Sequence, residues 1–144
     1  MATIRRFEDL DAGQTARRLV KQIYELTSAG SFARDFGLRD QIQRASVSVM
    51  SNIAEGFESR TQALFIDYLG RARASADDVR SQLYAALDLG YITEDQFEQA
   101  YELVDKVSRH IQRFIQYLIP HSQALRVHED APLFQPTSAN DPTF

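Results

Sequence analysis

The side chains in this sequence best suited to chemistry form a polar row between residues 41 and 55. Gln41, Arg44, Ser48, Asn52 and Glu55 are separated by steps of three, four, four and three residues. Such steps place side chains on one face of a helix, and an apolar row runs beside them. The spacing therefore predicts a helix with a polar face at the edge of its core.

A second polar row has the same helical spacing and also flanks apolar positions. It contains Arg71, Ser75, Asp78 and Gln82. Half-buried polar groups need hydrogen-bond partners. We therefore expect the two rows to pair as a network that fixes helix register or a subunit contact.

The same residues leave a second interpretation open. Glu55 and Asp78 could bind a metal or act as general acid and base, with Arg44 or Asn52 as the orienting group. Structural networks outnumber active sites among such clusters, so the sequence favours the structural interpretation, with no catalytic residue, no metal ligand and no cofactor. The expected structural or interface network comprises Gln41, Arg44, Ser48, Asn52, Glu55, Ser75 and Asp78.

Other kinds of chemistry are disfavoured by the residue types present. The sequence has no cysteine, which removes disulfide frameworks, cysteine-based metal sites and thiol nucleophiles. A carboxylate-bridged di-iron bundle needs two Glu-x-x-His pairs, but an apolar residue stands three positions before each histidine. The histidines, which we expect at the surface or at an interface, are His110, His121 and His128.

Apolar periodicity indicates four helices that position the polar rows. They are expected at about 8–27, 38–55, 61–88 and from 93 to 119. All four prolines lie after residue 119, and the connections are short, so consecutive helices should run antiparallel. The sequence therefore predicts an all-α fold, an up-down-up-down antiparallel four-helix bundle over residues 1–119. Residues 120–144 should form a Pro-containing C-terminal tail, extended or packed on the bundle or on a neighbouring subunit.

The last two helices carry the clearest heptad seams. Their apolar rows are Phe65, Leu69, Ala72, Ala76, Val79, Leu83 and Ala86, followed by Phe97, Ala100, Val104, Val107, Ile111, Phe114 and Leu118. Capping boxes are expected where these helices begin, with a hydroxyl and an amide three residues apart. The pairs with this spacing are Ser59 with Gln62 and Thr93 with Gln96.

The charge of the chain gives no general attraction to nucleic acid, because the formal net charge is -4. Two groups of basic residues could form small patches, but a charge-balanced solvated face explains each at least as well. They are Arg17, Arg18 and Lys21 on the first helix and Arg71, Arg73 and Arg80 on the third. No stretch approaches the ~18 apolar residues of a membrane-spanning helix, so we expect a soluble, cytoplasmic protein without a membrane partner.

The segment from Gln41 to Phe57, QIQRASVSVMSNIAEGF, resembles the signature of a known family. This family comprises small four-helix-bundle proteins encoded in intervening sequences of large-subunit (23S) ribosomal RNA genes. The resemblance extends over roughly Phe7 to Leu118, with Asp78 at a position where Glu is usual. It implies a bundle that assembles into a ring of five and has no assigned reaction. A related branch includes the accessory protein of diversity-generating retroelements, which binds a reverse transcriptase and its RNA through a basic surface.

These observations predict a non-enzymatic, self-associating four-helix bundle that acts as an assembly or accessory module, with the homopentamer implied by the resemblance alone. One alternative is a ribonucleoprotein component that binds ribosomal RNA or a nucleic-acid enzyme such as a reverse transcriptase. A second alternative is a carboxylate-based metal or ligand site at Glu55 and Asp78.

Overall fold

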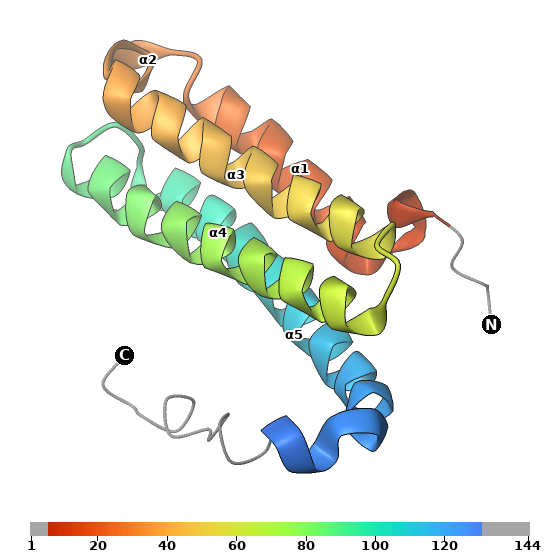
Figure 1. Cartoon of the computed structure of the whole chain (residues 1–144). Helices are drawn as coiled ribbons and strands as arrows, with labels where there is room; N and C mark the ends of the chain where they lie inside the picture. Colours follow the sequence, from red (N-terminus) through yellow and green to blue (C-terminus); the bar gives the residue numbers. More distant parts are fainter. Residues whose placement is uncertain (1–5, 131–144) are drawn as a thin grey trace.

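The computed structural model describes residues 6–130, and in this part of the chain all regular structure is helical (Figure 1). A short 3-10 turn, η1 (Phe7–Asp9), comes first. The helices are α1 (Asp11–Leu26), α2 (Gly30–Arg34), α3 (Phe36–Phe57), α4 (Gln62–Asp88) and α5 (Glu94–Asp130). The prediction of an all-α protein is therefore confirmed.

The four long helices lie side by side, and each contacts two others. α1 packs against α3 and α5, and α4 packs against the same two helices. Consecutive long helices run in opposite directions, while the short α2 lies in the connection between α1 and α3 (Figure 1). The contact between α3 and α4 is the most extensive of the four.

The chain begins with a turn where the sequence predicted a continuous first helix. Leu10 has an extended backbone with ψ of 134°, which separates η1 from α1. The turn folds back onto Gly13, where an added Cβ would lie 2.7 Å from the Phe7 carbonyl oxygen. Gly13 is thus the residue that lets η1 pack on α1.

The last helix continues past the residue where the tail was expected to begin. α5 extends to Asp130, ten residues beyond Pro120. Proline removes one backbone hydrogen bond from a helix, but its fixed φ is compatible with a helical backbone. The rest of the expected tail, residues 131–144, lies outside the described residues.

The apolar rows of α4 and α5 form the centre of the core. Phe65, Phe97 and Phe114 are half-buried, and every other member of the two rows is buried. Those with no exposed surface are Leu69, Ala72, Ala76, Val79, Leu83, Ala86, Ala100, Val104, Val107 and Ile111. Alternation of alanine with larger side chains lets neighbouring helices interlock closely.

One of the two expected capping boxes is present. At the start of α5, the Gln96 N–H donates to Thr93 Oγ1 at 3.1 Å, and the Thr93 N–H donates to Gln96 Oε1 at 2.9 Å. The expectation for Ser59 and Gln62 is wrong, because α4 begins after Thr61, whose hydroxyl accepts from the Leu64 N–H at 3.1 Å. Ser59 Oγ instead donates to the last turn of α3, at the Gly56 carbonyl.

A contact between distant parts of the chain closes one end of the helical body. Asp35 accepts hydrogen bonds from the Leu38 N–H, where it caps α3, and from the Tyr91 hydroxyl at 2.8 Å. The Tyr91 ring stacks on Phe32 with centroids 5.4 Å apart. The Leu38 N–H, and then Tyr91, lower the pKa of Asp35 below its ordinary 3.8. The connection between α4 and α5 is therefore tied to the start of α3.

We predict that Leu83→Ala lowers the free energy of unfolding by about 2 to 5 kcal/mol, because it leaves a cavity in a fully buried seam. Chemical denaturation measures this value. Ser81→Ala, at an exposed position on the same helix, serves as the control. Equal losses for the two variants would show that the assignment of the seam is wrong.

We predict that Asp35→Asn lowers the melting temperature at neutral pH. A lowered carboxyl pKa means that the folded state favours the ionised form, so its stabilisation is complete above the unfolded pKa. The stabilisation is lost as the pH falls through the folded pKa, below 3.8, and the two proteins should then melt closer together. Asp40→Asn, which removes only a surface ion pair with Arg39, is the control for carboxylate loss on α3. If the difference in melting temperature between Asp35→Asn and the unmodified protein stayed constant through the acid range, the stabilising role of the ionised Asp35 would be contradicted.

Candidate functional site

The centre of the predicted polar network lies between α3 and α4. The Asn52 amide nitrogen donates to the Ser48 carbonyl oxygen at 2.9 Å and to Ser48 Oγ at 3.0 Å. Ser75 on α4 donates to the same Ser48 Oγ at 3.0 Å. All three side chains are half-buried. The structure thus joins three of the seven predicted residues in one chain of hydrogen bonds across the two helices.

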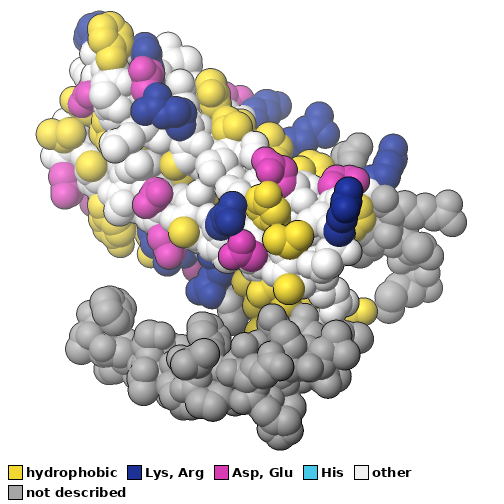
Figure 2. Space-filling model, viewed as in Figure 1, with side chains coloured by type: hydrophobic (Ala, Val, Ile, Leu, Met, Phe, Trp, Pro, Cys, Tyr) yellow, Lys and Arg dark blue, Asp and Glu magenta, His cyan; other side chains and the backbone are white. Residues whose placement is uncertain are grey.

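The other four predicted residues lie at the surface of this helix pair. Gln41, Arg44, Glu55 and Asp78 are exposed, and their side chains form no hydrogen bond or ion pair within the part of the chain that the structure describes. Figure 2, viewed as in Figure 1 with α3 and α4 in front, shows basic, acidic and apolar side chains interspersed on this face. Glu55 and Asp78 therefore face solvent rather than an enclosed site.

The second row contributes two further polar side chains beside this network. Arg71 bonds Asp67 at 3.0 Å and lies over the Tyr68 ring, 4.9 Å from its centroid. Gln82 Oε1 is shielded from solvent and has no hydrogen-bond partner among the described residues. A shielded carbonyl oxygen without a donor is uncommon in folded proteins.

Gly56 fixes how closely the end of α3 approaches the start of α4. An added Cβ would lie 2.9 Å from the Phe65 ring and 2.9 Å from Tyr68 Cβ. The Phe65 ring in turn packs against Phe57 and Phe114, with centroids 6.1 and 5.1 Å apart. The glycine of the Asn-Ile-Ala-Glu-Gly segment is therefore required by packing between helices.

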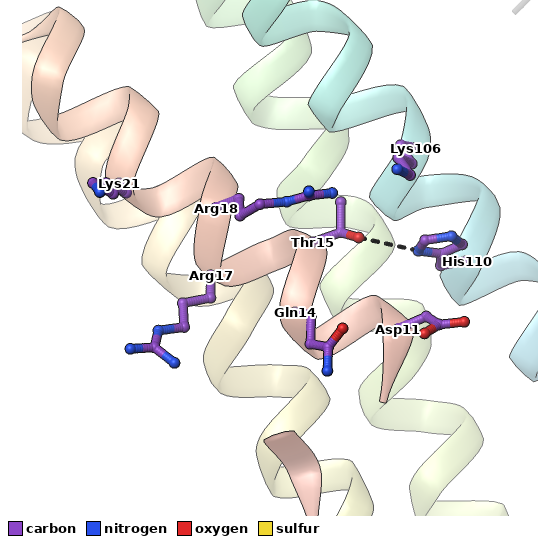
Figure 3. Close-up of a pocket in the computed structure, with 8 residues that line it drawn as sticks. All are labelled: Asp11, Gln14, Thr15, Arg17, Arg18, Lys21, Lys106 and His110. Carbon is purple, nitrogen blue, oxygen red and sulfur yellow. Dashed lines mark hydrogen bonds between the residues drawn. The ribbon is translucent and has the colours of Figure 1, made fainter. Parts of the chain in front are cut away.

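A groove on the opposite side of the molecule lies between α1 and α5 (Figure 3). It has a volume of about 880 Å³, and its lining includes Arg17, Arg18, Lys21 and Lys106. The sequence indicated the three cations of α1 but not Lys106, since their alignment depends on which helices pair. The sequence showed only that Lys106 and His110 are four residues apart and therefore lie on one face of a helix.

His110 lies in this groove, where Thr15 Oγ1 is 3.3 Å from its Nδ1 (Figure 3). Burial lowers the pKa of His110 below its ordinary 6.5, and Arg113, Lys106 and Arg109 lower it further, while Asp11 opposes them. A lowered pKa favours the neutral ring near pH 7, with one nitrogen as donor and the other as acceptor. The histidine is thus a polar, uncharged part of a cationic groove.

The described residues contain neither a membrane-spanning helix nor a metal-binding cluster. No helix among residues 6–130 is long and apolar enough to cross a membrane. Among the side chains that the structure describes, no group of three or more His, Cys, Asp or Glu is placed to hold a metal ion.

The helices, the polar contact between α3 and α4 and its close-approach glycine define a small all-α protein whose segment 41–57 resembles a known family. A family model confirms this resemblance. It describes the 23S rRNA-intervening sequence protein and matches residues 8–113. The chain therefore belongs to the 23S rRNA-intervening sequence protein family.

A solved structure supports the same fold. It is the crystal structure of a protein of unknown function from the S23 ribosomal protein family of Bacteroides thetaiotaomicron. The two chains are 21% identical and superpose with a TM-score of 0.67, over 72% of this chain and 97% of the other. A comparison with curated proteins gave no match.

We predict that Gly56→Ala destabilises the protein, because the clash costs about 1 to 3 kcal/mol and exceeds the helical preference for alanine. The matched control is Gly37→Ala, at an exposed glycine in the first turn of α3, where the added Cβ would meet only Asp35 Oδ1 at 3.8 Å, an ordinary contact. Gly37→Ala should raise stability by up to about 1 kcal/mol. Thermal or denaturant unfolding of both variants measures the contrast, and a stabilised Gly56→Ala would contradict it.

Proposed function

We propose that this protein is an up-down-up-down antiparallel four-helix bundle that self-associates and acts as a non-enzymatic assembly or accessory module in the cytoplasm. The pairwise contacts of the four long helices and their alternating directions support the bundle. The family resemblance supports a homopentamer. The lack of cysteine is compatible with a reducing compartment.

The observation that carries self-association is the incomplete pairing of the polar rows. Ser48, Asn52 and Ser75 satisfy one another, whereas the four outer members of the predicted network extend from the same helix pair without partners in the described chain. Their regular spacing places them along one continuous strip of surface. A second copy packed along this strip would supply the missing partners. A small turn of the Gln82 side chain toward that copy would satisfy its shielded oxygen as well.

The outer ridge of α4 gives a second argument for a partner helix. Ala63, Gly70, Ala74 and Ser81 are exposed and lie on one side of α4 at helical spacing. A glycine inside a helix costs about 1 kcal/mol relative to alanine, and no atom of the described residues lies within 4 Å of a Cβ added at Gly70. Small side chains let the axes of two helices approach closely, which suits a ridge that another copy covers.

A closed ring constrains how the copies meet. In a cyclic assembly of more than two copies, each contact joins two different surfaces of the protein. The strip on α3 and α4 would therefore face another surface of the next copy. Charges of both signs along the strip would select the register of that contact, since like charges brought together are unfavourable.

The ribonucleoprotein alternative also has an observation in its favour. The groove between α1 and α5 gathers four cationic side chains on a protein whose formal net charge is -4. Binding that depends on phosphate contacts would weaken steeply with salt.

We predict that light scattering of the purified protein gives a mass several times the 16.4 kDa of one chain, with five copies as the expected number. Asp78→Arg should shift the mass toward 16.4 kDa, because it reverses a charge on the strip. An exposed substitution should change the free energy of unfolding by no more than about 0.5 kcal/mol.

The control is Glu102→Arg, which reverses an exposed charge on α5, away from the strip. This variant should keep the mass of the unmodified protein. A particle of 16.4 kDa at micromolar concentration would overturn self-association, and equal mass for all three proteins would overturn the role of the strip.

A further inference from the structure

The side chains between α1 and α5 change in character along the length of the two helices. Beside Gln22, a hollow of about 400 Å³ is lined by Asp95, Glu98 and Glu102. The basic groove follows, and then a second hollow of about 400 Å³, which includes Phe114 and Tyr117. Acidic, basic and aromatic zones thus succeed one another on one side of the bundle.

The cations of the basic zone lack anionic partners. Arg18, Lys21 and Lys106 form no ion pair or hydrogen bond with the side chains or backbone groups that the structure describes. Figure 3 shows Arg18 reaching across the groove toward α5, where Lys106 and His110 lie, while Arg17 extends away from α5. Like charges held together repel one another, and a bound anion would relieve that repulsion. The acidic zone at the far end disfavours a second anion there.

The aromatic zone offers a different kind of contact. Tyr117 is 65% exposed, and its ring meets Phe114 edge-on with centroids 6.1 Å apart. Leu10 and Ala12 also line this hollow. Arg113 lines the same hollow, and an exposed aromatic ring beside a cation can stack with a nucleic-acid base.

The two zones meet at Asp11 and His110, which line both hollows. A carboxylate repels a phosphate but accepts hydrogen bonds from hydroxyl groups. Asp11 therefore disfavours a phosphate at the junction and favours a hydroxylated group there. The basic zone, Asp11 at the junction and the aromatic zone thus follow one another in the order of the phosphate, the sugar and the base of a nucleotide.

We propose that this groove binds a nucleoside phosphate, with the phosphate at Arg18 and Lys106, the sugar beside Asp11 and the base against Tyr117. The basic groove has the size of a small-molecule site. The same unit occurs as a free nucleotide and as a residue of single-stranded RNA. This inference specifies a ligand for the ribonucleoprotein alternative and does not depend on self-association.

Calorimetric titration with four probes tests the proposal: adenosine monophosphate, adenosine, inorganic phosphate and a short single-stranded oligoadenylate. Adenosine monophosphate or the oligoadenylate should bind, more weakly as salt is raised, and should bind at least about tenfold more tightly than adenosine or phosphate. Binding of the mononucleotide identifies a free nucleotide as sufficient. Binding of the oligoadenylate alone identifies the RNA strand as the source.

Matched variants connect binding to the groove. The double variant Arg18→Gln/Lys106→Gln should weaken binding about tenfold or more, because it removes two charge-assisted contacts. Arg34→Gln/Arg60→Gln removes the same net charge at exposed positions outside the groove and should bind normally. Tyr117→Leu should weaken nucleotide binding but not the weak binding of phosphate. Circular dichroism and light scattering of each variant verify the fold and the particle mass.

Three outcomes would overturn the proposal. They are no binding of any probe, equal binding of inorganic phosphate and adenosine monophosphate, and oligoadenylate binding that the double variant leaves unchanged. The last result would keep RNA binding but assign it to another surface. None of the three bears on self-association, which the particle mass reports separately.

Discussion

The close approach of α3 to α4 is the constraint on which the other surfaces depend. Gly56 leaves no room for a Cβ against Phe65 and Tyr68, and farther along the pair the Ser48 and Ser75 hydroxyls are 3.0 Å apart. A larger side chain at Gly56 would separate the helices at one end and stretch this hydrogen bond. Small residues bring these two helices together, and α1 and α5 cover the other side of the pair.

Sequence periodicity predicted the parts of the fold that repeat along a helix. The rows through Leu83 and Val104 are buried as predicted, because burial of one helix face imposes a period that a single sequence reveals. The Thr93 and Gln96 capping box was equally visible. The sequence did not show which hydroxyl caps the start of α4. Ser59 and Thr61 both suit an N-cap, and only the path of the chain out of α3 selects Thr61.

Features that join distant segments could not be predicted in the same way. The Tyr91 hydroxyl meets Asp35 across 56 residues of sequence, and neither residue belongs to a periodic pattern. The groove likewise requires α1 and α5, the first and last long helices, to lie side by side. Sequence showed a basic patch on α1 that a solvated face explained equally well. Lys106 and His110 of α5 line the same hollow as these cations, and this distinguishes a groove from a solvated face.

The arrangement of the helices places the two proposed surfaces on opposite sides of the molecule. Each long helix contacts two others, so the pair α3 and α4 lies across the core from the pair α1 and α5. In a ring, the strip of one copy meets a different surface of the next copy. Where that second surface is not the basic groove, the groove of each copy would remain accessible. A ring would then carry several identical grooves at fixed separations. A strand that reached more than one groove would gain affinity without any new kind of contact, because the second binding event is intramolecular. Self-association and ligand binding would be coupled in this way even though no side chain takes part in both.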